Sequence, residues 1–176
     1  MARQHIQPSL KERLMRDDDF IVSKADLKGR ITYSNQVFAE FSGFDESEYL
    51  GKQHNLVRHP DMPRCIFKML WQHIENGEEI FAYVKNICKD GSFYWVLANV
   101  TPSRDLQGQI VGYYSVRRKP NPRALEVIVP LYKELLQLEQ NAGSRDAITA
   151  SLTHMHNLLK EKGVSYERFI LDLQGL

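Results

Sequence analysis

Three β-rich apolar runs follow one another between residues 79 and 120, separated by short turns. The first turn contains Asp90-Gly91, a pair typical of two-residue β-hairpins because both turn positions must tolerate positive φ. The second turn covers residues 105–109. The pattern predicts three sequential antiparallel strands, which cannot bury an apolar face alone and therefore need covering elements from elsewhere in the chain.

The residues before this meander supply such elements. Two short apolar pieces, Phe20–Ser23 and Arg30–Tyr33, flank a turn and predict a further pair of strands. Apolar residues at helical spacing predict three helices, over residues 35–43, 46–50 and 65–77. The order of elements predicts an α+β fold, in which an antiparallel five-stranded sheet carries its helices on one face.

After Pro122 the apolar spacing is helical to the end of the chain. We expect a kink at Pro130, a break at Gly143 and a short third helix. These helices are too apolar to lie free in water, so they are expected to pack on the domain, on a second copy or on another protein. Tyr94 and Trp95 point to opposite faces of the sheet, so one of these rings is expected beneath the helices.

The start of the chain predicts one more helix. PSLKERLMRDDD, residues 8–19, is strongly charged, and its proline suits a first helical turn. We therefore divide the chain into an N-terminal helical cap (1–19), a central α+β domain (20–120) and a C-terminal helical extension for docking or dimerisation (121–176).

Composition excludes several classes of function. A net charge of +1 gives no electrostatic reason to bind nucleic acid. The two cysteines, Cys65 and Cys88, match neither a disulfide framework nor a paired metal motif. No apolar run approaches the roughly 20 residues that span a bilayer, and the polar N-terminus is no signal peptide. We expect a cytoplasmic protein without direct membrane insertion.

The segment HNLVRHPDMP groups His54, Arg58, His59 and Asp61 beside two prolines, the first of which excludes a helix. Composition alone leaves three readings open. These are a capped surface turn, a metal site on His54, His59 and Asp61 with a further ligand from elsewhere, and an acid–base pair of His59 and Asp61. No nucleophile flanked by small residues lies nearby, so the sequence predicts no enzyme activity.

Four residues outside this segment also stand out. Asn86 lies in the middle of a predicted strand, where Asn is depleted, so its amide is expected to have a specific partner. Asn35 precedes a predicted helix and suits its N-cap. Phe67 and Trp71 lie on the predicted helix 65–77 and serve either the core or a stacking surface.

Together these elements resemble a PAS domain: two strands, short helices, one longer helix and a three-strand meander. HNLVRHPDMP is the most specific part of a resemblance to the PAS domain of the Aer-type aerotaxis receptors of bacteria. ITYSNQVFAEFSGFDESEYLGKQ, Trp71 and KNICKDGSFYWVLANVTPSRD also match. The resemblance covers Phe20 to Pro120 and continues more weakly into PLYKELL.

The resemblance implies non-covalent FAD in the PAS pocket, as a redox reporter. Carried over by position, it implies cofactor-binding roles for Arg58, His59 and Asp61, and places at or near the pocket for His54, Asn35, Phe67, Trp71 and Asn86. Arg58 offers a fork of donors for a pyrophosphate. His59 and Asp61 are expected to hydrogen-bond the ribityl chain or to orient Arg58, and an Asn amide complements the edge of a flavin ring.

Two positions depart from the related flavin-binding photosensor (LOV) domains. Alignment on Leu50-Gly51 places His54 where those domains need Cys, so adduct photochemistry is not expected. Val96 stands where they have a second Asn, so fewer amides are expected to hold the ring.

The expected function is that of an FAD-binding redox or oxygen sensor in energy taxis. The sequence lacks the anchor and coiled coil of the Aer receptors, and so looks like the free-standing PAS subunit of bipartite energy-taxis receptors. We expect it to signal to a separate chemoreceptor or transducer chain, which recruits it to the inner membrane, or to form a homodimer. Flavin reduction is expected to alter hydrogen bonding at Asn86 and the docking of the sheet or the extension.

Two alternatives remain open. One is a haem-binding PAS gas sensor, with His54, His59 or His73 as the axial ligand. The other is a cofactor-free PAS interaction module.

Overall fold

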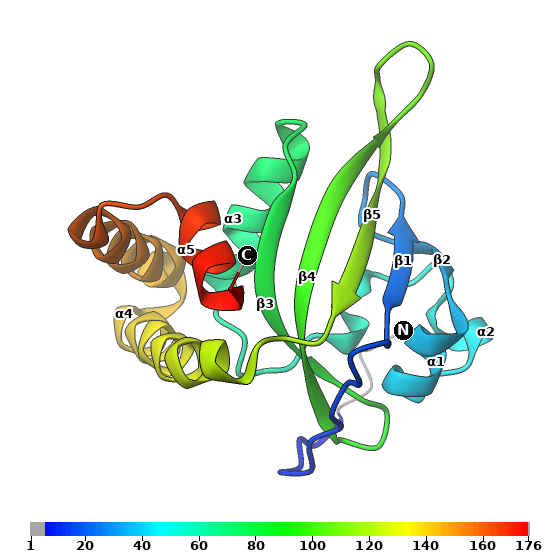
Figure 1. Ribbon diagram of the computed structural model, residues 1–176, viewed down its shortest axis with the longest axis horizontal. Helices are drawn as coiled ribbons and strands as arrows, with labels where there is room; N and C mark the ends of the chain where they lie inside the picture. Colours follow the sequence, from blue (N-terminus) through cyan, green and yellow to red (C-terminus); the bar gives the residue numbers. More distant parts are fainter. Residues whose placement is uncertain (1–5, 176) are drawn as a thin grey trace.

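The meander lies at the centre of the protein, whose computed structural model describes residues 6–175 (Figure 1). The strands are β1 (Ile21–Ala25), β2 (Ile31–Ser34), β3 (Ile80–Ile87), β4 (Phe93–Arg104) and β5 (Ile110–Arg118). They form one antiparallel sheet in the order β2-β1-β5-β4-β3. The predicted α+β class and five-stranded sheet are confirmed.

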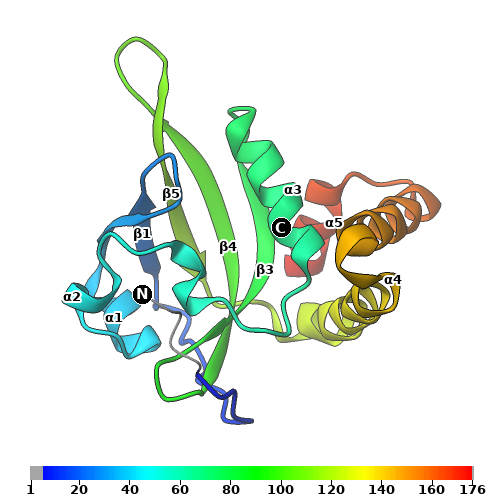
Figure 2. The same cartoon turned by 180° about the vertical axis from the view of Figure 1, so that it is seen from behind.

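Helices connect and cover these strands. They are α1 (Gln36–Ser42), α2 (Glu46–Tyr49), α3 (Arg64–Glu75), α4 (Pro122–Lys162) and α5 (Tyr166–Gln174), with a 3-10 turn, η1, at His54–Val57. Figure 2 shows α1, α2 and α3 on one face of the sheet, with α4 and α5 beside β3. The three predicted helices before the meander are confirmed.

Asn35 fixes the start of α1, as its position in the sequence predicts. Its side-chain oxygen accepts from the backbone N–H groups of Phe38, at 3.2 Å, and Val22, at 3.0 Å. Its amide donates to the carbonyl of Phe20, at 2.7 Å. One side chain therefore caps α1 and also ties the helix to the start of β1.

The predicted helix over residues 8–19 is wrong, and its neighbours in the cap, residues 1–5, lie outside the described residues. β5 pairs with β4 only from Leu97 onward, so Phe93 has a free edge. Residues 11–13 occupy it: Arg13 N donates to Phe93 O at 2.7 Å, and Phe93 N donates to Lys11 O at 2.9 Å. An extended backbone is favoured because this edge supplies its hydrogen bonds.

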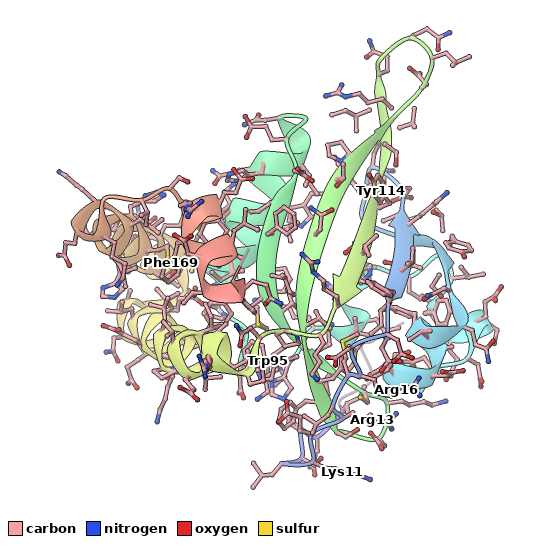
Figure 3. All side chains as sticks on the ribbon, viewed as in Figure 1. Lys11, Arg13, Arg16, Trp95, Tyr114 and Phe169 are labelled. Carbon is pink, nitrogen blue, oxygen red and sulfur yellow. The ribbon has the colours of Figure 1, made fainter. Side chains whose placement is uncertain are left out.

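Arg13 strengthens this attachment (Figure 3). Its guanidinium donates to Ser92 Oγ at 2.9 Å and to Asp90 Oδ2 at 2.8 Å, and also reaches the carbonyls of Glu40 and Phe41. The N-terminal segment thus joins the β3–β4 hairpin to the end of α1.

The C-terminal extension packs on its own domain. α4 lies against α3, and α5 lies against β3. Trp95, on the face of the sheet opposite α3, lies 6.0 Å from the ring of Tyr132 in α4, which identifies the ring expected beneath these helices (Figure 3). Gly143 breaks α4 with φ 72° and ψ 172°, as predicted, whereas helical dihedrals continue through Pro130.

No helix within residues 6–175 has the length and apolar character needed to cross a membrane. Cys65 and Cys88 are buried free thiols.

A buried carboxylate connects the extension to α3. Pro63 precedes α3 and has no polar side chain to cap it, and Glu139 of α4 takes that role. Glu139 is 7% exposed and accepts from the backbone N–H groups of Arg64 and Cys65, both at 3.0 Å. Ser151 Oγ donates to the same carboxylate at 2.8 Å. The negative charge lies where the helix dipole of α3 favours it.

Glu139→Gln is expected to lower the free energy of unfolding by about 1–3 kcal/mol. An amide keeps the size of the side chain, but its NH₂ group meets backbone donors and leaves one of them unpaired. Urea unfolding followed by circular dichroism measures the change.

Glu126→Gln is the matched control, since Glu126 lies exposed on the same helix. We expect it to change the free energy of unfolding by less than about 0.5 kcal/mol. Equal stability of the two variants would show that Glu139 does not stabilise the junction.

Candidate functional site

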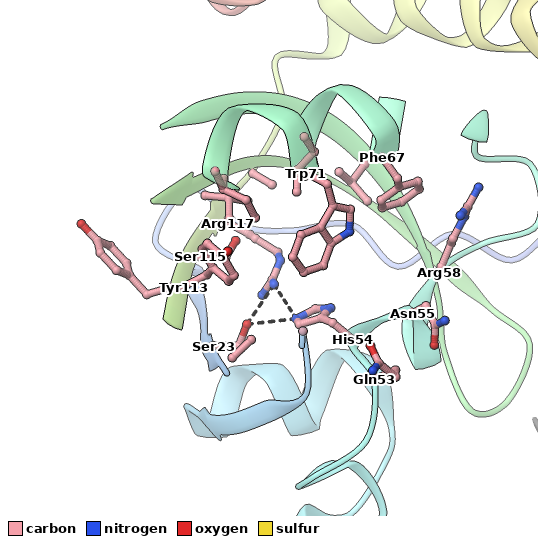
Figure 4. Close-up of a pocket in the computed structure, with 18 of the residues that line it drawn as sticks. Ser23, Gln53, His54, Asn55, Arg58, Phe67, Trp71, Tyr113, Ser115 and Arg117 are labelled. Carbon is pink, nitrogen blue, oxygen red and sulfur yellow. Dashed lines mark hydrogen bonds between the residues drawn. The ribbon is translucent and has the colours of Figure 1, made fainter. Parts of the chain in front are cut away.

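A cavity of about 240 Å³ lies between α3 and the inner face of the sheet (Figure 4). α3 and the segment around η1 form one side, and β1, β3, β4 and β5 form the other. The wall contains the rings of Phe67, Trp71 and Tyr113, and the last two pack edge to face at 5.6 Å. This is a mainly apolar space with a few polar groups, as is usual for small-molecule sites.

Five of the residues singled out from the sequence line this cavity: His54, Arg58, Phe67, Trp71 and Asn86. Asn86, which is 4% exposed, reaches it from the middle of β3. The specific partner expected for this amide stays a prediction, and the structure places Asn86 in the cavity wall.

Asn35, His59 and Asp61 do not line the cavity. Asn35 caps α1. His59 is 2% exposed, and its Nδ1 accepts from the backbone N–H of Asp61 at 3.1 Å. The Asp61 carboxylate pairs with Lys85 Nζ at 2.7 Å. These contacts hold the turn after η1 against β3.

Arg58 lies at the rim of the cavity, on the far side of Phe67 from Arg117 (Figure 4). Its guanidinium carbon lies 4.2 Å from the centre of the Phe67 ring, and Nη2 donates to Met62 O at 3.0 Å. A backbone bridge also links Arg58 to Asn86. The cation is therefore held in a fixed orientation.

Arg117, which the sequence patterns did not single out, enters the opposite end of the cavity from β5. Its Nη2 donates to His54 Nε2 at 2.7 Å and to Ser23 Oγ at 2.9 Å (Figure 4). A guanidinium has only donors, so His54 Nε2 must be the unprotonated nitrogen. Alternation along β5 could have predicted its position, since it places Tyr113, Ser115 and Arg117 on one face of the sheet.

Burial and the nearby charge of Arg117 lower the pKa of His54 to about 3. Burial lowers the pKa of Arg117 to about 10. At neutral pH the pair is therefore a neutral imidazole that accepts from a charged guanidinium.

The metal reading finds no support in the geometry of residues 6–175. That part of the chain contains no group of three His, Cys, Asp or Glu side chains arranged to hold an ion.

The family described as the PAS fold matches residues 31–117. The aerotaxis receptor of Escherichia coli (strain K12) is 40% identical over 119 residues, which are 68% of this chain and 23% of that protein. Residues 31–117 are a PAS domain. Its sequence resembles the PAS region of the aerotaxis receptor, as predicted from HNLVRHPDMP and the meander.

Other proteins resemble this PAS domain in sequence or in fold. The nitrogen fixation regulatory protein of Klebsiella pneumoniae is 25% identical over 67% of this chain and 23% of that protein. The structure described as "Flavin Analogue Sheds Light on Light-Oxygen-Voltage Domain Mechanism" has a TM-score of 0.55 and 24% identity, covering 63% of this chain and 83% of that chain. The chain thus spans about a quarter of the length of these two curated relatives.

The neutral His54 predicts a pH dependence of stability. A histidine in the unfolded chain titrates near pH 6.5, whereas the folded PAS domain holds the pKa of His54 at about 3. Below pH 6.5 only the unfolded state takes up this proton, so the free energy of unfolding falls as the pH falls. His59, whose pKa burial and Lys85 lower to about 4, acts in the same direction.

His54→Gln is expected to reduce this slope by about 1 kcal/mol per pH unit between pH 5.5 and 4.5. Urea titrations at several pH values measure it. His156→Gln, a change at an exposed position on α4, is the control and should leave the slope unchanged. If the two variants have the same slope, His54 is not held neutral in the folded protein.

Proposed function

We propose that this PAS domain binds a flavin, FAD, and acts as a redox or oxygen sensor in energy taxis, without catalytic turnover. The observation that carries the proposal is the make-up of the cavity. Its wall is aromatic, and one end contains two buried polar atoms, Ser115 Oγ and Arg117 Nη1, that have no hydrogen-bond partner among the described residues. A planar ring with carbonyl oxygens along one edge fits both features.

The relatives support a flavin over other planar ligands. The solved structure with a TM-score of 0.55 is described by its flavin analogue, and the domain resembles the Aer-type receptors in the segment that forms the rim. A bound flavin supplies reversible electron acceptance, while the protein sets its orientation and electrostatic surroundings.

The size of the cavity supports a division of the cofactor between the cavity and its rim. About 240 Å³ lies just below the range of roughly 300–1,000 Å³ of whole small-molecule sites, so the cavity accommodates the ring and the remaining groups extend past the rim. Arg58 stands there with a bidentate fork suited to a pyrophosphate. We assign His59 and Asp61 an indirect role, in holding the turn that carries Arg58.

The signal has a direct route from the cavity to the extension. Asn86 and Val84 line the cavity from β3, while Tyr83 on the same strand bonds both C-terminal helices. Tyr132 OH of α4 donates to Tyr83 O at 2.8 Å, and Tyr83 OH donates to Gln174 Oε1 of α5 at 3.0 Å. A difference of a few kcal/mol between two arrangements of β3 suffices for switching.

The receiver of the signal is, in this proposal, a separate chemoreceptor or transducer chain, or a second copy of this chain. Val127 and Val129 are 43% and 44% exposed, and they offer apolar contact area on α4, the helix that bonds Tyr83 O through Tyr132.

A haem gas sensor fits the cavity less well. His54 is the histidine among its lining residues, and its Nε2 already accepts from Arg117. Ligation of iron by this nitrogen requires that bond to break and brings a second cation to the buried guanidinium.

The absorption spectrum of the purified protein tests the proposal. After incubation with FAD and removal of the excess, we expect bands near about 450 nm that migrate with the protein. A Soret band would instead indicate haem. A protein that remains colourless would refute flavin binding.

Arg58→Ala tests the assignment of the rim. Loss of a charge-assisted contact of roughly 1.5–3 kcal/mol should weaken FAD binding about 10- to 100-fold and leave riboflavin, which has no phosphate, nearly unaffected. Fluorescence titration measures both affinities. Arg145→Ala, at an exposed position on α4, controls for net charge, and an equal loss for both flavins would place the phosphates elsewhere.

A further inference from the structure

Arg117 is a buried cation whose partners are neutral. It is 5% exposed, and its Nη2 bonds are to the hydroxyl of Ser23 and the unprotonated Nε2 of His54. No Asp or Glu within residues 6–175 forms an ion pair with it. Its Nη1 has no hydrogen-bond partner in the same part of the chain.

Such an arrangement opposes folding. A buried charge is tolerated when an opposite charge and hydrogen bonds compensate for lost hydration, and two neutral acceptors on one nitrogen compensate only in part. Two arginines are adjacent at the end of β5, and alternation along the strand directs only Arg117 into the cavity. Arg118, the next residue, points to the opposite face of the sheet, beside Phe81 and Leu97.

The neighbours of Arg117 are arranged to keep it charged and in place. His54 contributes a lone pair instead of a second positive charge, and Ser23 holds the same Nη2 from β1. Ser115 Oγ, two residues earlier on the same face of β5, lies unpartnered within the described chain. Figure 4 shows these side chains together at one end of the cavity, with Trp71 as the neighbouring wall.

We propose that Arg117 determines the charge that the cavity accepts: its guanidinium donates to an acceptor atom on the edge of the bound ring and stabilises negative charge there. This inference rests on the proposed function. For a flavin, it means that the cavity binds the reduced ring more tightly, relative to the oxidised ring, than it would without Arg117, because reduction places more electron density on that edge. Arg117 thereby raises the reduction potential of the bound flavin.

The potential of the bound flavin is the measurement that tests this. The FAD-loaded protein is titrated with dithionite, which supplies the electrons, against a reference dye at fixed pH. Arg117→Met is expected to change the ratio of affinities for reduced and oxidised flavin at least tenfold, which lowers the two-electron midpoint potential by about 30 mV or more. Circular dichroism establishes that the variant is folded.

Two variants separate charge from packing. Arg117→Lys keeps the positive charge and is expected to keep the potential near that of the natural protein. Arg118→Met removes the same charge from the same strand on the other face of the sheet and should leave the potential unchanged.

The flavin content and the midpoint potential of these variants decide whether Arg117 has this role. If Arg117→Met loses flavin altogether while Arg117→Lys retains it, the charge is required for recognition and the inference stands. If Arg117→Met has the potential of the natural protein, or if both Arg117 variants lose flavin equally, the inference is overturned while the proposed function stands. If the natural protein takes up no flavin, both fall.

Discussion

Burial of β3 and β4 on both faces is the constraint on which the rest of the structure depends. On one face Val84, Asn86 and Ala98 line the cavity beneath α3. On the other, Tyr83 and Trp95 pack beneath the extension and are at most 8% exposed. Strands buried on both sides need cover on both sides, so α4 and α5 complete the fold of the sheet at the same time as they provide its outward surface.

The sequence predicted those parts of the fold that local chemistry determines. Asp90-Gly91 lies in the hairpin turn, Asn35 caps α1, and Gly143 ends a helical run. The turn differs in detail from the prediction, because Gly91 has positive φ and Asp90 does not. The predicted helix over residues 8–19 is wrong because residues 11–13 pair with the free edge at Phe93, eighty residues after Arg13 in the chain. Pro130 lies exposed on α4, and the backbone keeps helical dihedrals there, with the buried side chains of Ile128 and Leu131 on either side of it.

The same distinction holds for the site. Asn86 could be singled out from the sequence because Asn is depleted in the middle of strands. His59 and Asp61 share a motif with Arg58, but the turn after η1 directs them to β3 and away from the cavity. The sequence did not distinguish Arg117 from a surface residue, because two adjacent arginines at the end of a strand are common on protein surfaces. Only the covering of its face by α3 and η1 makes the first of the two a buried cation.

The extension holds both walls of the cavity. Glu139 fixes the start of α3, which carries Phe67 and Trp71, and Tyr132 fixes the carbonyl of Tyr83 in β3. Both side chains belong to the first half of α4, less than two helical turns apart. A change in the separation of α3 and β3 must therefore either move this half of α4 as a unit or break one of the two attachments. Because both attachments are buried, and breaking either leaves a polar group unpaired, movement of the helix is the less costly response.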